Sequence, residues 1–281
     1  MNDSKLVTLV LGATGKTGSR VARGLTAAGR PVRTAARSGA DVRFDWNEPD
    51  TFAPALAGAD RVYLVPPVLR TDFGPVVSAF LDTADQACVR HVTFLSVYGT
   101  EVVPPNPAMR EAELDLSARG GLSRSILRPA WFMQNFSETF LQPVGDVIAV
   151  PVGHGTEAFV DAGDIAAVAV ETLRDPSAHH GAEYAITGPE ALTMAETAEV
   201  ISAVTGRRIV HADPDREEWV AAVVASGVPA SYGAVLRELT ATIASGHGAI
   251  PNDTVKAVTG RGPRTFAEFA RGAVAAWTGQ A

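Results

Sequence analysis

The sequence predicts an α/β protein with a Rossmann-like doubly wound parallel sheet and a smaller C-terminal α/β lobe. Short β-branched apolar runs alternate with longer segments of helical period, the pattern of βαβ units and of a parallel sheet covered on both faces. A glycine-rich stretch follows the first apolar run directly, and the regular alternation of strand-like and helical segments ends after Pro129. We therefore expect a sheet domain at residues 1–130 and a lobe at residues 131–281, interleaved with the first domain and not folding independently.

The elements of the sheet domain follow from the period of the apolar residues. The predicted strands are Val7–Leu11, Val32–Ala35, Arg61–Val65, Val92–Leu95 and Ser125–Leu127, with a short additional strand at Asp41–Phe44. Between them, helical period predicts helices at Ser19–Ala28, Thr51–Ala57, Phe73–Ala87 and Ala108–Arg119.

The second half begins with the segment Trp131–Phe140, which is aromatic and loop-like. A helix is expected at Ile165–Leu173, followed by elements at Tyr184–Thr187, Ala195–Thr205, Arg208–His211 and Asp215–Ala225. Two helix starts have the Ser/Thr-x-x-Glu spacing of a capping box, Thr193 with Glu196 and Thr265 with Glu268. The last helix is expected to run to about Trp277.

Composition and charge exclude several classes of protein. The net charge of −7 argues against a nucleic-acid partner, because binding a polyanion needs a clustered basic face. The single cysteine, Cys88, cannot form an internal disulfide, and the six histidines are scattered, so we expect a reduced compartment and no metal. No apolar run reaches the roughly 18 residues of a membrane span, and no signal peptide is evident, which predicts a cytoplasmic protein without a membrane partner.

The sharpest chemical signal is the glycine loop, residues 12–18, between the first predicted strand and helix. One glycine permits the tight turn, a second lets the backbone approach a pyrophosphate, and a third allows close helix–strand packing. The helix N-terminus offers unpaired N–H groups to phosphate oxygens. This context predicts dinucleotide binding by a site made of Gly12, Thr14, Gly15, Lys16, Thr17 and Gly18.

The end of the second strand distinguishes NADP(H) from NAD(H). An acidic residue there would accept a hydrogen bond from the ribose 2′-hydroxyl of NAD, but this chain has Arg37 and Ser38. Arg37 could bind a 2′-phosphate with its planar set of donors, with Ser38 adding a hydroxyl and Arg33 lying nearby. NADP(H) is therefore the expected cofactor.

Several sequence segments together resemble those of the NmrA-like proteins of the atypical short-chain dehydrogenase/reductase superfamily. They are the glycine loop, Arg37-Ser38, Asp45-Trp46, the stretch from Tyr63 to Pro67, and the stretch from Leu127 to Phe136. Within that family, the last stretch and residues 43–46, 187–193 and 258–266 resemble the ergot-alkaloid-type reductases, the agroclavine or festuclavine dehydrogenase-like branch. The resemblance implies a role in secondary metabolism, NADP(H) in the crevice at the strand ends and Asp45 near the adenine. Val65, Pro66 and Pro67 would form a rigid loop beside the cofactor.

The Tyr-x-x-x-Lys pair common in short-chain reductases is absent from this sequence. Many NmrA-like and related plant reductases instead place a lysine three residues before a helical glutamate. By that spacing Glu113 makes Arg110 the counterpart, and an arginine cannot act as a base near neutral pH. Arg110 could hold a ribose hydroxyl, the cofactor amide or an anionic substrate group.

Other side chains are candidates for the site. Ser96 and Tyr98 follow a strand whose carboxyl end faces the expected nicotinamide, so they are candidate catalytic residues with Arg110; Ser96 could also contact the cofactor and Tyr98 the substrate. The acidic run formed by Glu111, Glu113 and Asp115 is expected to be a solvated helix face. An apolar wall for a flat substrate, or alternatively an aromatic core, would be made of Trp131, Phe132, Met133 and Phe136. Gln134 or Asn135 would then orient the substrate.

These patterns predict an NADPH-dependent reductase that delivers hydride to an apolar, cyclic acceptor. An iminium ion needs little proton help because it is already electrophilic, and a quinone or enone is the other acceptor class. The competing interpretation is a non-catalytic NADP(H)-binding redox sensor. We expect a monomer or homodimer whose partner is a small-molecule substrate.

Overall fold

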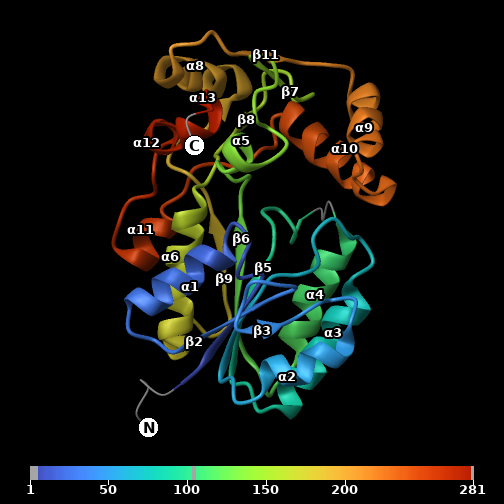
Figure 1. The fold of residues 1–281 in the computed structure, drawn as a ribbon, viewed down its shortest axis with the longest axis vertical. Helices are drawn as coiled ribbons and strands as arrows, with labels where there is room; N and C mark the ends of the chain where they lie inside the picture. The colour runs from blue at the N-terminus through green and yellow to red at the C-terminus, as the bar shows by residue number, and fades with distance from the viewer. Residues whose placement is uncertain (1–5, 103–105, 280–281) are drawn as a thin grey trace. The chain divides into compact units, whose positions relative to one another are not determined.

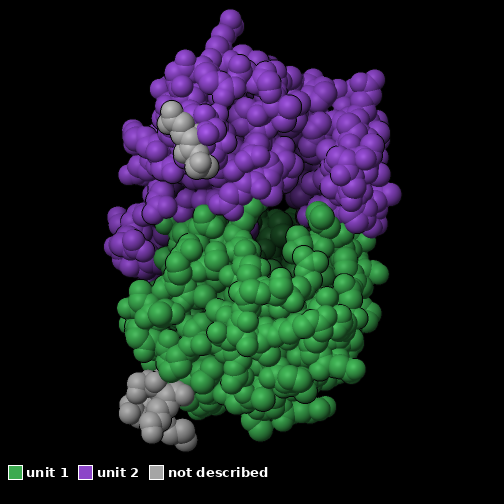
Figure 2. Space-filling view, viewed as in Figure 1, with its two compact units in different colours: residues 1–129, 162–185 green, residues 130–161, 186–281 purple. Residues whose placement is uncertain are grey.

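The computed structural model describes residues 6–102 and 106–279, which form two compact units (Figure 2). Unit 1 contains Met1–Pro129 and Ala162–Ala185, and unit 2 contains Ala130–Asp161 and Ile186–Ala281. The lobe was expected to begin near residue 130 and to be interleaved with the first domain. In the structure the chain returns to unit 1 for residues 162–185 before completing unit 2.

Unit 1 is built on a seven-stranded sheet with the order β3-β2-β1-β4-β5-β6-β9. The neighbouring strands from β3 to β6 all pair in parallel. The strand order reverses beside β1, and this is where a doubly wound sheet binds its ligand. The predicted α/β doubly wound fold is confirmed. The strands are β1 (Thr8–Leu11), β2 (Val32–Ala36), β3 (Val42–Arg43), β4 (Arg61–Leu64), β5 (His91–Leu95), β6 (Ser123–Pro129) and β9 (Ala182–Ile186).

Helices cover both faces of this sheet (Figure 1). Helices α1 (Gly18–Ala27) and α6 (Ala162–Arg174) pack together on one face. On the other face lie α2 (Phe52–Leu56), α3 (Gly74–Gln86) and α4 (Pro107–Ala118). The short helices η2 (Pro49–Thr51) and α7 (Pro176–His179) complete the unit. Each strand and helix predicted before Pro129 is present, with ends shifted by only a few residues.

An aromatic cluster fixes the loops at one side of the sheet. Phe44, Trp46, Phe52 and Phe80 pack with ring centroids 5.0–5.7 Å apart. The Trp46 indole Nε1 donates a hydrogen bond of 3.2 Å to the carbonyl of Val65, directly after β4. The loops that follow β3 and β4 are therefore held together by both ring packing and a hydrogen bond.

Unit 2 contains mostly helices, with two small sheets. β8 pairs antiparallel with β10, and β7 pairs in parallel with β11. Both predicted capping boxes are present. A helix at 230–244 was not predicted, and the last predicted helix is divided into two. The elements are α5 (Asn135–Glu138), β7 (Val147–Ala149), β8 (Thr156–Glu157), β10 (Leu192–Thr193), α8 (Met194–Thr205), β11 (Val210–Ala212), α9 (Arg216–Ala225), α10 (Ala230–Ala244), α11 (Thr254–Thr259), α12 (Phe266–Ala273) and α13 (Ala275–Thr278).

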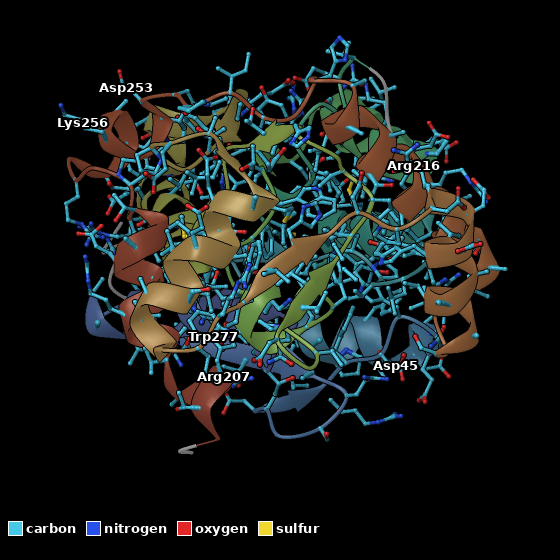
Figure 3. All side chains as sticks on the ribbon, turned by 90° about the horizontal axis from the view of Figure 1, so that it is seen from above. Asp45, Arg207, Arg216, Asp253, Lys256 and Trp277 are labelled. Atoms are coloured by element: carbon cyan, nitrogen blue, oxygen red, sulfur yellow. The ribbon has the colours of Figure 1, made fainter. Side chains whose placement is uncertain are left out.

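The core of unit 2 is also aromatic. The Phe136 ring packs edge-on against those of Phe159 and Phe266. The Trp277 Nε1 donates to the carbonyl of Phe136 at 2.6 Å, and the Arg207 guanidinium donates to the carbonyl of Trp277 at 2.7 Å (Figure 3). These bonds attach the end of the chain to the unit. Among the described residues, no helix is both long and apolar enough to cross a bilayer.

The turn between β1 and α1 in unit 1 depends on Gly18. A Cβ at this position would lie 2.3 Å from the carbonyl oxygen of Gly12 and 2.9 Å from that of Leu11. Both contacts are with backbone, which cannot rotate away as a side chain can. Only glycine allows α1 to begin this close to the end of β1.

Gly18→Ala is therefore expected to destabilise the protein by at least about 1–3 kcal/mol, because the helix start must move. Gly272→Ala is the matched control, since no atom lies within 4 Å of a Cβ added there in α12. The control should be neutral or stabilising by up to about 1 kcal/mol. Urea unfolding of both variants measures the difference, and equal effects would contradict this account of the turn.

Candidate active site

The glycine loop presents backbone to the carboxyl edge of the sheet. Gly12 has φ +61°, and the amide of Gly15 donates to the Gly12 carbonyl at 2.8 Å, closing a tight turn. Thr14 and Gly15 are exposed, Lys16 is half-buried, and Thr17 and Gly18 are buried. The N-cap Thr17 makes no side-chain capping bond, and the first turn of α1 has no acidic residue. The N–H groups of this turn therefore suit an anion.

The glycine loop also passes a test of fit for a bound pyrophosphate. A Cβ at Gly15 would meet only one atom within 4 Å, the Gly12 carbonyl oxygen at 3.2 Å, so this face of the loop is open. A phosphate can then approach the backbone closely. The residues present fit a dinucleotide.

The loop after β2 lies beside the glycine loop. A Cβ at Gly39, which has φ +69°, would lie 3.8 Å from Cγ2 of Thr14. Arg37 and Ser38 are exposed, and Arg37 has no hydrogen bond or ion pair to any other described residue. Arg33, expected to lie nearby, donates through Nη1 to the carbonyls of Ala55 and Ala57 at 3.1 and 2.5 Å.

The loops after β3 and β4 border the same site. Asp45 accepts a hydrogen bond from the amide of Asn47 at 2.9 Å, so its carboxylate stabilises the local turn. A Cβ at Gly12 would lie 3.6 Å from Cβ of Val65, which places the start of the β4 loop against the glycine loop. Pro66 and Pro67 are buried and stiffen that loop.

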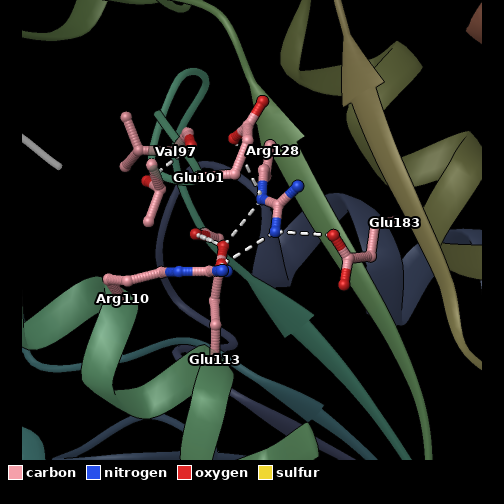
Figure 4. Close-up of polar contacts among 8 residues, drawn as sticks. Val97, Glu101, Arg110, Glu113, Arg128 and Glu183 are labelled. Carbon is pink, nitrogen blue, oxygen red and sulfur yellow. Dashed lines mark hydrogen bonds and ion pairs between the residues drawn. The ribbon is translucent and has the colours of Figure 1, made fainter. Parts of the chain in front are cut away.

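A buried ionic cluster lies past the ends of β5 and β6 (Figure 4). Glu113 of α4 is completely buried. Its Oε1 accepts from the Ser96 hydroxyl at 2.5 Å and from Arg128 Nε at 2.9 Å. Its Oε2 accepts from Arg110 Nη1 at 2.7 Å and from Arg128 Nη2 at 2.8 Å. Four donors use the acceptor sites of one carboxylate.

Glu113 was expected on a solvated face, and that prediction was wrong. Met109, Ala112 and Leu116 are buried, and their spacing puts Glu113 on the same inward stripe of α4. Sequence reasoning also did not single out Arg128, which is 5% exposed at the end of β6. The helical phase of Glu113 and the position of Arg128 after an apolar strand were the signals that could have identified both residues.

The electrostatics of the cluster keep its groups charged. Burial alone would raise the pKa of Glu113, but hydrogen bonds from Arg128, Ser96 and Arg110 outweigh burial and lower it. Burial works against the charge of Arg128, yet Glu113, Glu101 and Glu183 together raise its pKa. Arg128 pairs with Glu183 at 2.7 Å and with Glu101 at 3.3 Å. Glu113 is therefore an ionised anchor, not a proton donor at neutral pH.

The three candidate catalytic residues, Ser96, Tyr98 and Arg110, differ in how much of each side chain is exposed. Ser96 is 3% exposed, and its hydroxyl proton is directed to Glu113, so the expected direct contact of Ser96 with a ligand does not agree with its burial. Arg110 is one-third exposed, with 33% of its side-chain surface accessible. Tyr98 is half-buried, and its amide donates to the carbonyl of Pro129 at 3.0 Å, extending the pairing of β5 with β6. Arg110 and Tyr98 are the two that reach the surface.

In unit 2, the aromatic segment is divided between core and surface. Met133 and Phe136 are fully buried in the core, so the expectation that they contact a substrate was wrong. Trp131, Phe132 and Asn135 keep exposed area.

Glu157 supports this segment from within unit 2. Its carboxylate accepts from the amides of Trp131 at 3.3 Å and Ala249 at 2.8 Å, and burial raises its pKa to about 7. The position of the Trp131 backbone therefore depends on a carboxyl group that sequence reasoning did not single out.

Replacing the anchor of the ionic cluster should be costly. Glu113→Gln would leave two guanidinium groups without their buried counter-charge, and we expect a loss of about 3–5 kcal/mol in the free energy of unfolding at pH 7. Because the pKa of Glu113 is lowered from 4.5, the wild-type advantage should shrink as the pH falls below that value.

The matched control for this change is Glu111→Gln, an exposed position on the same helix. It should change stability by no more than about 0.5 kcal/mol. Urea unfolding between pH 3 and 8 compares the variants, and an equally small effect of Glu113→Gln would refute the role of the cluster.

Comparison with known proteins gives close agreement over the whole chain. An uncharacterized oxidoreductase of Bacillus subtilis, YesF, is 38% identical, with 96% of each chain covered. An NAD(P)H azoreductase of Xenophilus azovorans is 34% identical, covering 96% of this chain and 98% of its own. An agroclavine dehydrogenase of Claviceps fusiformis is 33% identical, covering 93% and 95%.

Solved structures share the fold. A nucleoside-diphosphate-sugar epimerase from Staphylococcus aureus superposes with a TM-score of 0.82 at 21% identity, covering 95% of this chain and 99% of its own. NmrA, a negative transcriptional regulator in complex with NAD, gives 0.76 at 16% identity, covering 95% of each chain. The family model for NAD(P)H-binding proteins matches residues 12–176, from the first glycine of the loop to the start of α7. The chain therefore belongs to the NAD(P)H-binding family and is an NAD(P)H-dependent oxidoreductase.

Proposed function

We propose that this protein is an NADPH-dependent reductase of apolar, cyclic or conjugated acceptors, in the class of iminium ions, quinones, enones and azo compounds. The observation that carries this proposal is the chemistry of the carboxyl edge of unit 1. The loop that fits a pyrophosphate follows β1, and the ionic cluster adjoins β5, two strands away in the sheet. Glu113 is ionised and fully hydrogen-bonded, and Arg110 cannot lose its proton, so neither supplies a general base. Hydride transfer to an electrophilic acceptor suits such a site.

The cofactor would lie across the carboxyl edge of the sheet. Backbone amides of Thr14 and Thr17 would bind the pyrophosphate, and Arg37 with Ser38 would bind the 2′-phosphate. The adenine would then lie on the β2 and β3 side, near Asp45. The opposite end would lie over β4 and β5, near Val65 and Tyr98. The free guanidinium of Arg37 and its place beside the glycine loop support this orientation.

In this proposal the protein's residues position the nicotinamide and the acceptor and exclude water from them. When bound, the reduced nicotinamide supplies the hydride. The stiff Pro66–Pro67 segment would form one wall beside it, and Arg110 would face the acceptor. Holding the reacting atoms about 3–3.5 Å apart supplies most of the rate in such a transfer.

The relatives support the range of acceptors. One is named an NAD(P)H azoreductase and another an agroclavine dehydrogenase, both over nearly the full length of this chain. The first name indicates reduction of azo compounds, and the second indicates a dehydrogenase that acts on agroclavine. We therefore include azo compounds beside the iminium, quinone and enone acceptors.

The test is acceptor-dependent oxidation of NADPH at 340 nm against a panel of cyclic iminium ions, quinones, enones and azo dyes. If the protein is this reductase, at least one class of acceptor should be turned over with saturable kinetics. Tight NADPH binding without turnover for any of them would instead support the competing function, a redox sensor that binds NADP(H).

A second prediction concerns the choice of cofactor. Arg37→Asp should raise the Kd for NADPH at least about 10-fold, because it replaces a charge-assisted hydrogen bond with repulsion of the 2′-phosphate. Affinity for NADH should be unchanged or higher. Fluorescence titration measures both.

The control for this charge change is Arg23→Asp on the exposed side of α1. It makes the same change of charge without a predicted phosphate contact, so its Kd for NADPH should stay within about 3-fold of wild type. Equal weakening by both substitutions would show a general charge effect and would contradict the assignment of Arg37.

A further inference from the structure

Arg110 is a cation held in place at the carboxyl edge of unit 1. Its Nη1 donates to Glu113, and this is its one hydrogen bond to any described residue. A guanidinium has five N–H donors, so the others remain for a ligand. One-third of the side chain is exposed. The group therefore presents unused donors to the surface from a fixed position.

The partner of Arg110 explains why that position is fixed. Glu113 is fully buried and bonded on both oxygens, with Arg128 held on its other side by two hydrogen bonds (Figure 4). If Arg110 swung away, a buried carboxylate would lose one of its four donors. Leaving a buried charge without all of its hydrogen-bond partners costs folding free energy. Arg110 is thus preorganised, which is the property that electrostatic catalysis requires.

Helix α4 is entered directly from the β5 side, so its first turns lie near the carboxyl ends of the strands. Arg110 is in the first turn of α4, and Ser96, one residue past β5, shares Glu113 with it. The guanidinium therefore lies at the edge where the dinucleotide is proposed to place its reactive ring.

Resting on the proposed reductase function, we propose that Arg110 is a catalytic residue that stabilises negative charge on a neutral conjugated acceptor, and that quinones, enones or azo compounds are the preferred substrates over cationic iminium ions. The unused N–H groups would donate to the carbonyl oxygen of a quinone or enone, or to one nitrogen of an azo group. Arg110 keeps all its protons throughout.

The electrons and atoms balance in this step. Hydride forms a new bond at the far atom of the conjugated system, which is the β-carbon of an enone, the opposite carbonyl oxygen of a quinone or the second azo nitrogen. The π electron pair moves to the oxygen or nitrogen beside Arg110, and the cofactor leaves oxidised. Water later protonates that anion. A cationic iminium develops no negative charge, since hydride neutralises it, so a fixed guanidinium would repel this substrate and would not assist the reaction.

The experiment compares Arg110→Gln with a matched control, Arg174→Gln. Arg174 exposes 42% of its side chain and pairs with Glu171 at 2.9 Å, with the same spacing of three residues as Arg110 and Glu113. Both variants are assayed with a naphthoquinone, a neutral azo dye and N-methyl-3,4-dihydroisoquinolinium. Arg110→Gln should lower kcat about 100-fold on the neutral acceptors, the typical cost of one donor to a developing anion. Its loss on the iminium should be much smaller, or the rate should rise.

Two further readouts separate catalysis from structure. Added methylguanidinium should restore part of the lost kcat on the quinone, because it can replace the missing group. Arg110→Lys keeps a charge that titrates near pH 10.4, so its rate on neutral acceptors should fall at high pH where the wild-type rate does not. If Arg110→Gln fails to fold, the pH dependence of Arg110→Lys alone tests the proposal.

The outcomes distinguish this proposal from the proposed function. Equal losses on neutral and cationic acceptors, with no rescue and no new pH dependence, would overturn the role of Arg110. Turnover of the iminium alone by wild type would leave the reductase standing and overturn this inference. No wild-type turnover on any acceptor would overturn both.

Discussion

The bond network of one buried carboxylate organises the carboxyl edge of unit 1. Glu113 has no exposed surface, yet it receives four hydrogen bonds from residues on α4, β6 and the end of β5. Arg128 extends the network to Glu183 of β9. An ionised group can be buried only if such partners compensate its desolvation. The carboxyl ends of β5 and β6, strand β9 and helix α4 are therefore linked through one ionic network.

The other side of the same edge is organised by backbone and rings, not by charge. Gly18 lets α1 begin against β1, and the close approach of Gly12 to Val65 brings the loop after β4 beside it. Trp46 holds that loop by a hydrogen bond to the Val65 carbonyl. The glycine loop and a polar cluster thus share one edge, separated by β4. That arrangement suits an extended cofactor whose two ends need different surroundings.

Sequence reasoning predicted the parts of this arrangement that depend on local pattern. The glycine loop and the strand runs have signals within a few residues, so strands β1 to β6 were predicted with nearly correct boundaries, whereas β9 was assigned to the C-terminal lobe. The buried state of Glu113 was missed because its acidic neighbours suggested solvent, while its phase on the helix depends on tertiary packing.

The same limit explains the errors in unit 2. Helix α10 contains Gly233, which disfavours a helix in sequence, but a Cβ there would lie 2.8 Å from Val224 of α9, so the glycine allows the two helices to pack. The return of residues 162–185 to unit 1 depends on contacts between segments far apart in the chain, as between Gly24 of α1 and Val170 of α6. No short motif reports such contacts.

The central claim is that one dinucleotide extends along the carboxyl edge of unit 1 with its reactive ring at the Arg110 end. A crystal structure of the protein with NADPH tests this most directly. The account predicts the pyrophosphate on the amides of the glycine loop, the 2′-phosphate on Arg37 and the nicotinamide over β4 and β5, with Arg110 facing its acceptor side. A dinucleotide bound in the reverse direction, or bound away from the glycine loop, would contradict the account.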